Sequence, residues 1–264
     1  MRLVVCILLL LNAAGCGGLR SGSAALGDAR YVDLTHSFDA STIYWPTEEG
    51  FVLEKGFAGT TEGGWHYEAN RFRAAEHGGT HLDAPRHFAE GAQSAETVPL
   101  DRLIGDAVVI DVMRACTEDR DHAISVEDVI AFESVNGVIP EGAIVLLRTG
   151  WSNNWPDRER YLGTARRGRA GVAQLHFPGL SAEAAQFLVE RNVAAVGIDT
   201  ASIDPGVSTT FEAHQVLGGA NVPVFENLAN LDRLPPRDFE VVALPMKIGG
   251  GSGAPLRAVA ILRD

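Results

Sequence analysis

The chain has 264 residues, of which 46% are hydrophobic and 21% are charged, so it is long enough to bury the core of one globular domain. Its 22 basic and 34 acidic side chains give a formal net charge of −12, which repels a phosphate backbone and excludes nucleic acid as the expected partner. Neither an internal repeat nor an interdomain linker is visible in the sequence, and both absences favour a single domain.

The N-terminus has the pattern of an export signal. Arg2 is followed by nine apolar residues at positions 3–11, too few for a membrane-spanning helix but suited to the core of a signal peptide. Asn12-Ala-Ala-Gly15-Cys16 then resembles a bacterial lipoprotein box, although Ala13 stands where that pattern prefers leucine. We therefore predict export to the periplasmic side of the cell envelope, with a lipidated Cys16 attaching the chain to a membrane.

Ordinary secretory cleavage after Ala24 or Ala25 is the alternative to lipidation. With a lipoprotein-type leader, the predicted organisation is a signal peptide over residues 1–15, a flexible tether over 16–30 and a folded domain over 31–264. Cys116 is then the single cysteine of the exported domain, so no internal disulfide can form and the core must hold the fold.

Short apolar segments alternate with loops and a few helices along the domain. Residues 107–112 and 143–148 are continuous apolar runs, as expected of strands buried on both faces, and further strands are predicted over residues 31–34, 51–55, 194–198, 241–245 and 257–262. A capping box at Ser125 and Asp128 begins one helix towards Ser134, and Ser181 begins another that ends near Asn192. We expect a mixed α/β domain, with residues 151–172 forming a long exposed loop.

Three histidines and an aspartate are concentrated in eleven residues: His77, His81, Asp83 and His87. Their spacing does not place them on one helical face, and Gly78-Gly79 oppose a helix. All four positions are odd, so an extended segment would project them to one side. Imidazole nitrogens and carboxylate oxygens gathered in this way predict a site for a divalent cation.

The segment His77-Gly-Gly-Thr-His81-Leu-Asp83-Ala-Pro-Arg-His87-Phe88 is similar to the H-x-G-T-H-x-D-x-P-x-H-F motif of the cyclase-like metal-dependent hydrolases. That family includes bacterial kynurenine formamidases and isatin hydrolases. The similarity continues in order through Trp45-Pro46 and through residues 148–151, 197–200, 202–204, 212–214, 223–228 and 253–257. It implies an α/β fold, a mixed-sheet single domain that resembles the swivelling β/β/α fold of the family.

The resemblance also implies a role for each matching residue. His77, His81 and Asp83 match metal ligands of the formamidases, with Asp83 placed to bridge two ions. A distant histidine and glutamate twelve residues apart hold the second ion in that family, a spacing that His214 and Glu226 meet. The implied cofactors are two divalent metal ions, Zn²⁺ or Mn²⁺, since no thiolate ligand favours either. The family is also typically dimeric or built from dimers.

His87 matches the histidine that donates and accepts protons in the formamidases, and Trp45 matches a tryptophan that contacts substrate there. Core packing is the alternative interpretation of Trp45. The implied reaction is metal-assisted hydrolysis of an amide, in which a metal-activated water attacks the carbonyl and His87 is the general acid and base. No serine nucleophile is indicated, because Ser152, Ser181 and Ser252 all lack the G-x-S-x-G pattern.

Two features favour a cyclic or aryl amide of the isatin type as the small-molecule substrate. Export separates the protein from tryptophan breakdown in the cytoplasm, and residues 56–65 and 151–172 are additional to a minimal formamidase. Hydrolysis of N-formylkynurenine by an arylformamidase is the first alternative. A metal-dependent surface binding protein without turnover is the second, and an intact His87 argues against it.

The remaining features have supporting or structural interpretations. His36 and His66 are isolated, so we expect hydrogen-bonded structural roles for them, and we assign no role to His176. Asp199, Thr200, Ser202 and Asp204 follow a predicted buried strand and are expected to support the site through hydrogen bonds. Residues 249–253 lack the following helix of a phosphate-binding loop and are predicted to form a wall of the pocket.

Overall fold

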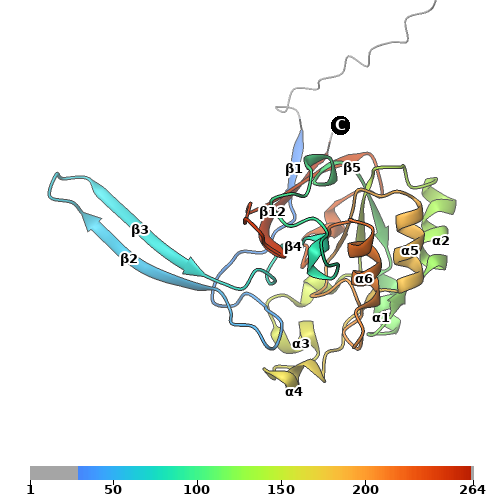
Figure 1. The fold of residues 1–264 in the computed structure, drawn as a ribbon, viewed down its shortest axis with the longest axis horizontal. Coiled ribbons are helices and arrows are strands. Elements are labelled where there is room, and N and C mark those ends of the chain that lie inside the picture. Colours follow the sequence, from blue (N-terminus) through green and yellow to red (C-terminus); the bar gives the residue numbers. More distant parts are fainter. Residues whose placement is uncertain (1–28, 263–264) are drawn as a thin grey trace, which may run out of the picture.

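A mixed β-sheet that closes on itself forms the centre of residues 29–262, the part of the chain that the computed structural model describes (Figure 1). Its strands are β1 (Arg30–Asp33), β4 (His81–Asp83), β5 (Ile104–Asp111), β7 (Ile144–Arg148), β9 (Ala195–Ile198), β10 (Val224–Glu226), β11 (Phe239–Pro245) and β12 (Gly253–Leu262). They lie in the order β1-β12-β11-β5-β7-β9-β10-β4, and β4 also pairs with β12. Strands β5, β7, β9 and β10 run parallel, while the other pairings are antiparallel.

The buried strands separate two apolar layers. On β5, Ala107 and Val109 pack inside the closed sheet, whereas Val108 and Ile110 pack against the helices outside it. Because successive side chains of a strand point to opposite faces, a strand between two cores must be apolar at every position. The continuous apolar runs predicted as doubly buried strands therefore have that environment.

Helices cover one side of the closed sheet, on the right of Figure 1. They are α1 (Met113–Glu118), α2 (Val126–Asn136), α5 (Ala182–Glu190) and α6 (Glu212–Gly219). The short helices α3 (Arg158–Leu162) and α4 (Arg169–Val172) lie apart from them, at the bottom of Figure 1. The predicted capping box at the start of α2 is present, since the Ser125 and Asp128 side chains each accept from the other's backbone N–H. Ser181 caps α5 as predicted, with its hydroxyl accepting from Ala184 N.

Residues 151–172 do not form the predicted exposed loop. A 3₁₀ helix, Trp151–Asn154, is followed by α3 and α4, and Tyr161 and Leu162 are fully buried. These two side chains pack with Phe177 in a third apolar cluster. The many arginine, glycine and asparagine residues of the segment conceal this core contribution, so the prediction of an exposed loop was wrong.

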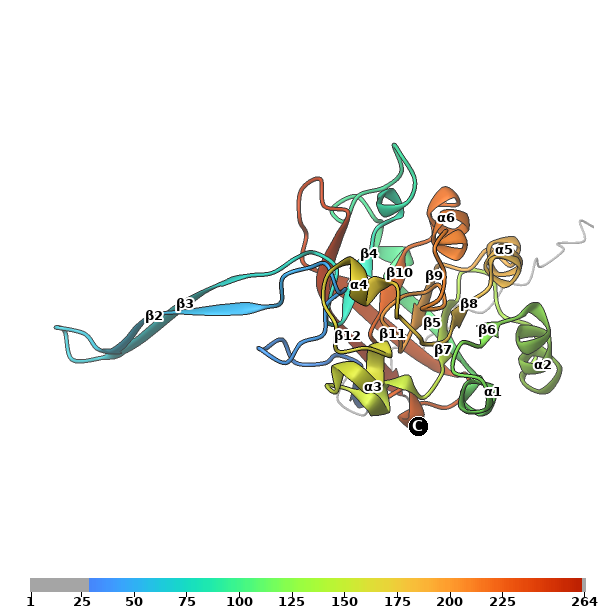
Figure 2. The ribbon, with the colours of Figure 1, turned by 90° about the horizontal axis from the view of Figure 1, so that it is seen from below.

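A long β-hairpin projects away from the domain (Figures 1 and 2). It consists of β2 (Val52–Thr60) and β3 (His66–Arg73), with an irregularity in register between Lys55 and Ala58. Every residue of β3 is exposed. The predicted strand over residues 51–55 is only the base of this hairpin, and residues 56–65 include its tip.

The predicted signal peptide and most of the predicted tether lie outside the described residues. Arg30, assigned to the tether, begins β1.

Two short strands, β6 (Ala123–Ile124) and β8 (Gly179–Leu180), form a separate parallel pair. Within residues 29–262, no helix combines the length and apolar character needed to cross a membrane.

Candidate metal centre

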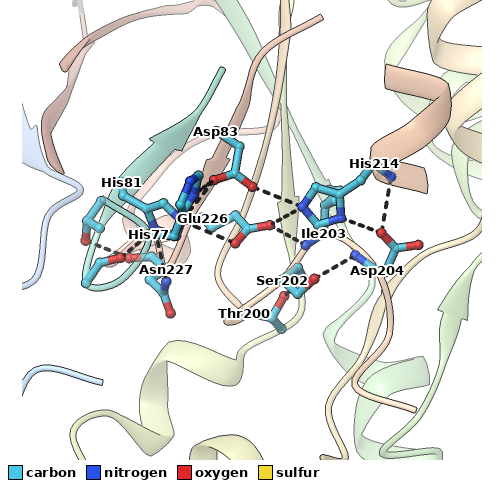
Figure 3. Close-up of polar contacts among 12 residues, drawn as sticks. His77, His81, Asp83, Thr200, Ser202, Ile203, Asp204, His214, Glu226 and Asn227 are labelled. Carbon is cyan, nitrogen blue, oxygen red and sulfur yellow. Dashed lines mark hydrogen bonds and ion pairs between the residues drawn. The ribbon is translucent and has the colours of Figure 1, made fainter. Parts of the chain in front are cut away.

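Two neighbouring strands bring three of the five predicted ligands together. His81 and Asp83 lie two residues apart on β4, so their side chains share a face. Glu226 on β10 is the direct antiparallel partner of His81. His81 Nε2 is 3.1 Å from Asp83 Oδ1 and 3.6 Å from Glu226 Oε2 (Figure 3). Strand register therefore places these three groups around one point.

His214 reaches the same point from α6. Its Nε2 atom is 3.0 Å from Asp83 Oδ2 and 3.3 Å from Glu226 Oε1. Its Nδ1 atom lies 2.5 Å from Asp204 Oδ2, and that carboxylate also accepts from the backbone N–H groups of Ala213 and His214 (Figure 3). The Asp204 carboxylate can only accept, so Nδ1 carries a proton, and Nε2 is the nitrogen that would bind an ion held between Asp83 and Glu226. Asp204 thus has the supporting role that its position after a buried strand predicted.

His77 approaches through a turn and not along an extended segment. Only His81–Asp83 is a strand, and Pro85–His87 is a 3₁₀ helix, so the predicted single extended run is wrong. Gly79 has φ +58°, and a Cβ on Gly78 would lie 2.1 Å from the Tyr44 ring. The glycines therefore permit a left-handed turn packed against an aromatic ring. This turn brings His77 Nδ1 to 2.6 Å from Asp83 Oδ1.

His87 stacks on His77 with ring centroids 3.8 Å apart, and its edge faces the His214 ring at 5.9 Å. Burial lowers the pKa of His87 to about 4, with the neighbouring imidazoles of His77, His214 and His81 acting in the same direction against the Asp83 carboxylate. His87 is therefore a neutral imidazole at physiological pH, the form that accepts a proton.

The buried carboxylates and imidazoles at the centre perturb one another strongly. Burial opposes ionisation of Asp83, but His77 and His81 outweigh it and hold the pKa of Asp83 well below its usual range. Burial also opposes protonation of His214, yet Asp204, Asp83 and Glu226 raise its pKa well above the ordinary value. Burial and the adjacent Asp83 raise the pKa of Glu226. Positive charge is thus strongly favoured between these groups.

Two groups of side chains have the composition and spacing to hold a metal ion. His77, Asp83 and His87 form one group, and His81, Asp83 and Glu226 form the other, each with its donor atoms within 4.8 Å of one another. Asp83 belongs to both groups, so its carboxylate would contribute to both sites if two ions were bound. His87 fits a ligand as well as a proton carrier by distance alone. The donor set of imidazole and carboxylate suits Zn²⁺ or Mn²⁺.

A cavity of about 410 Å³ opens above these groups, within the range of pockets for small molecules. Its remaining walls include Ile43, Tyr44, Trp45, Glu48, Glu76, Phe88, Ala201, Ser202, Phe211, Asn227 and Ser252. Trp45 packs against Phe211 and Phe177, with ring centroids 6.1 and 6.4 Å away. The cavity therefore has an aromatic wall beside the ligand groups.

The isolated histidines lie away from this cavity. His36 stacks on Trp155 at 4.2 Å, His66 is exposed on β3, and His176 pairs with Asp121 at 2.7 Å. The position of His176 agrees with its lack of an assigned role. The predicted hydrogen-bonded roles are not found for the other two side chains: the buried Nε2 of His36 has no hydrogen-bond partner, and the His66 side chain makes no hydrogen bond within residues 29–262.

Two predicted supporting segments contact the site or its frame. Asp199 accepts hydrogen bonds from Thr149 N and Oγ1 at 2.8 and 2.6 Å, which joins the ends of β7 and β9. Ser252, within the predicted pocket wall, lines the cavity. Sequence reasoning missed Glu76 and Asn227 as wall residues, although each adjoins a predicted ligand.

Comparisons with known proteins identify the family. The Cyclase family model, described as "Putative cyclase", matches residues 32–205. The chain is 31% identical to the isatin hydrolase of Roseibium aggregatum over 195 residues, covering 71% of this chain and 72% of that protein. It is also 31% identical to the kynurenine formamidase of Salinibacter ruber over 239 residues, covering 88% of this chain and 97% of that protein.

Solved structures give the same result. Isatin hydrolase A from Ralstonia solanacearum has a TM-score of 0.79 and 35% identity, covering 90% of this chain and 93% of that chain. An isatin hydrolase bound to the product analogue thioisatinate has a TM-score of 0.80 at 27% identity, covering 90% of this chain and 94% of that chain. The predicted resemblance and mixed α/β fold are thereby confirmed, and the chain belongs to the cyclase family of hydrolases.

Proposed function

We propose that this protein is a metal-dependent amidohydrolase that cleaves a C–N bond in a cyclic or aryl amide, in the manner of an isatin hydrolase. The observation that carries the proposal is the pair of ligand groups sharing Asp83 at the base of an aromatic cavity. The relatives named as isatin hydrolase and kynurenine formamidase support the same reaction class.

Two divalent ions, Zn²⁺ or Mn²⁺, are proposed as cofactors. His77, His81, Asp83, His214 and Glu226 would hold them, and the shared carboxylate of Asp83 supports the number two. Such ions supply Lewis-acid polarisation of a carbonyl and lower the pKa of a coordinated water towards neutrality.

The protein's own groups have separate tasks in this proposal. His87, held neutral by burial, takes a proton at one ring nitrogen and returns it to the leaving nitrogen of the amide. Asp204 holds His214 in the tautomer that presents Nε2 to the site. Trp45 and Phe211, whose rings are tilted by 57° to each other, provide an apolar aromatic wall that orients an aromatic substrate and excludes water.

The wall of the cavity favours a neutral amide over a zwitterionic one. Within the described part of the chain, its lining residues include acidic Glu48 and Glu76 but neither lysine nor arginine. The α-carboxylate of N-formylkynurenine would therefore meet neither lysine nor arginine there, while an uncharged planar ring would pack on Trp45. Hydrolysis of N-formylkynurenine remains the second candidate, supported by the similarity to a kynurenine formamidase.

A substrate panel tests the reaction class. The full chain is stripped of metal with a chelator, supplied with Zn²⁺ or Mn²⁺, and assayed against isatin, other cyclic amides and N-formylkynurenine. We expect turnover to disappear on chelation, to return with metal, and to be fastest with the cyclic aromatic amides. Normal metal binding without turnover of any amide would favour a metal-dependent surface binding protein instead.

We further propose a homodimer assembled through the projecting hairpin. Leu53, Phe57, Trp65, Tyr67 and Phe72 on it are all at least half exposed. A two-stranded hairpin alone is only marginally stable, so its apolar side chains need a partner surface. Residues 52–73 carry three acidic and three basic side chains, which makes the hairpin neutral in a chain of net charge −12. It can therefore approach an acidic second copy without repulsion.

The hairpin proposal predicts a change in mass. Replacing Phe57 and Trp65 together by serine is expected to convert a dimer to a monomer at micromolar concentration, measured by light scattering after size exclusion. Val135→Ser, on the exposed side of α2, is the matched control and is expected to leave the dimer intact. A dimeric double variant would refute the role of the hairpin.

Export and lipid attachment are proposed from residues 1–16, whose pattern of a basic residue, an apolar run and a small-residue box before Cys16 supports them. Mass spectrometry of the mature protein isolated from bacteria that express the full chain tests this directly. A diacylglycerol-modified Cys16 is expected at the N-terminus, whereas an unmodified terminus after Ala24 or Ala25 would indicate ordinary secretion.

A further inference from the structure

The three ligand histidines each have one ring nitrogen turned towards the ligand groups and the other turned away. His81 Nδ1 lies 3.0 Å from the carbonyl oxygen of Gly79, and His214 Nδ1 lies 2.5 Å from Asp204. Both outer partners only accept hydrogen bonds, so each would keep the proton on Nδ1 of its imidazole and leave Nε2 to an ion bound among the inner carboxylates. His77 is different, because its outer nitrogen faces a hydroxyl group.

That hydroxyl belongs to Ser252, whose Oγ lies 2.8 Å from His77 Nε2. A hydroxyl can donate or accept, so by itself it would allow either tautomer of His77. Ser252 Oγ also lies 2.7 Å from Oε2 of Glu76. A carboxylate oxygen accepts only, and therefore the serine proton points to Glu76. The remaining lone pairs of Ser252 Oγ then accept the Nε2–H of His77.

The backbone of Ser252 and Gly253 in turn fixes the position of the Glu76 carboxylate. Its Oε2 atom accepts from the backbone N–H of Ser252 at 3.0 Å and of Gly253 at 3.3 Å. The segment can lie this close only because residue 253 is glycine, since a Cβ there would be 2.5 Å from His77 Cε1. The start of β12 and the residue preceding His77 are thus joined through one carboxylate.

We propose that Glu76 and Ser252 form a positioning pair that fixes the Nε2–H tautomer of His77 and so presents its Nδ1 lone pair to the metal. This inference rests on the metal centre proposed above. Glu76 and Ser252 are positioning residues, because they act on the ion through His77. The Glu76 carboxylate accepts the serine proton, which leaves the lone pairs of Ser252 Oγ to accept from His77.

Metal affinity of the full chain tests the pair without reference to turnover. Mn²⁺ is titrated calorimetrically into the metal-free protein, and Ser252→Ala is expected to weaken binding about 10- to 100-fold, the usual effect of removing a partner of a ligand histidine. Glu76→Gln is expected to weaken binding in the native background but to have almost no further effect when Ser252 is alanine. Additive losses would mean that Glu76 does not act through Ser252 and would overturn the proposal.

A control variant separates positioning from folding. Ser181→Ala removes the cap of α5, so it should lower the melting temperature while leaving Mn²⁺ affinity unchanged. Ser252→Ala should lower the Mn²⁺ affinity while leaving the melting temperature of the metal-free chain unchanged. Equal Mn²⁺ affinity in Ser252→Ala and the unaltered chain would refute the positioning role alone. Failure of the unaltered chain to take up Mn²⁺ or Zn²⁺ would refute the metal centre and this inference together.

Discussion

His87→Ala is expected to lower kcat/KM for an amide substrate by roughly 100- to 10,000-fold, the contribution typical of a positioned general acid or base. The reason is the position of a neutral, half-buried imidazole stacked on the ligand His77 and bordering the cavity. Among the described residues, the other histidines that line the cavity, His77, His81 and His214, all belong to the proposed ligand set, so none is left to replace His87. Steady-state kinetics with metal-saturated protein measures the loss.

Metal content distinguishes the two roles that distance allows for His87. As a proton carrier, its loss leaves two ions per chain, measured by elemental analysis of the purified variant. A fall to one ion would show that His87 is a ligand in the group with His77 and Asp83. His176→Ala is the matched control, because that exposed histidine pairs with Asp121 and does not line the cavity. Its kinetics should equal those of the unaltered chain.

Asp83→Asn is expected to remove both ions and abolish measurable turnover. Asparagine keeps the size of the side chain but loses the charge of the carboxylate that belongs to both ligand groups. The affinity for each ion should therefore fall by more than about 100-fold. Replacing a residue that only hydrogen-bonds to a ligand usually lowers metal affinity by about 10- to 100-fold, and Asp83 is itself a proposed ligand. Calorimetric titration of metal-free protein with Zn²⁺ and with Mn²⁺ gives the two affinities separately.

A second aspartate–histidine contact provides the control for this variant. Asp121 lies 2.7 Å from His176 at the surface, so Asp121→Asn also removes a charge beside an imidazole. It should retain both ions and full activity. If Asp83→Asn instead kept one ion at native affinity, Asp83 would serve a single site, and the two-ion centre would be wrong.

Short-range patterns predicted most of the regular structure. Continuous apolar runs at residues 107–112 and 143–148 identified β5 and β7, because alternate side chains of these strands pack into two different apolar layers. Ser125 and Ser181 marked helix starts because capping depends only on the next three residues. Strands β4 and β10, each three residues long, carried too little periodicity to be found. The helices of residues 151–172 were missed because Tyr161 is buried by distant contacts, among them a hydrogen bond to Asn227.

The amino-acid sequence by itself determined the chemistry at stake: a concentrated set of histidine and aspartate side chains, a family motif and a second histidine–glutamate pair. Only the tertiary structure decided how these groups meet. His214 comes within 3.0 Å of Asp83 across 131 positions, and Ser252 within 2.8 Å of His77 across 175, through strand pairings far apart in the chain. Such contacts depend on register and sheet closure, which no local pattern encodes. The same physical reason explains why Glu76 and Ser252 became visible as a pair only in three dimensions.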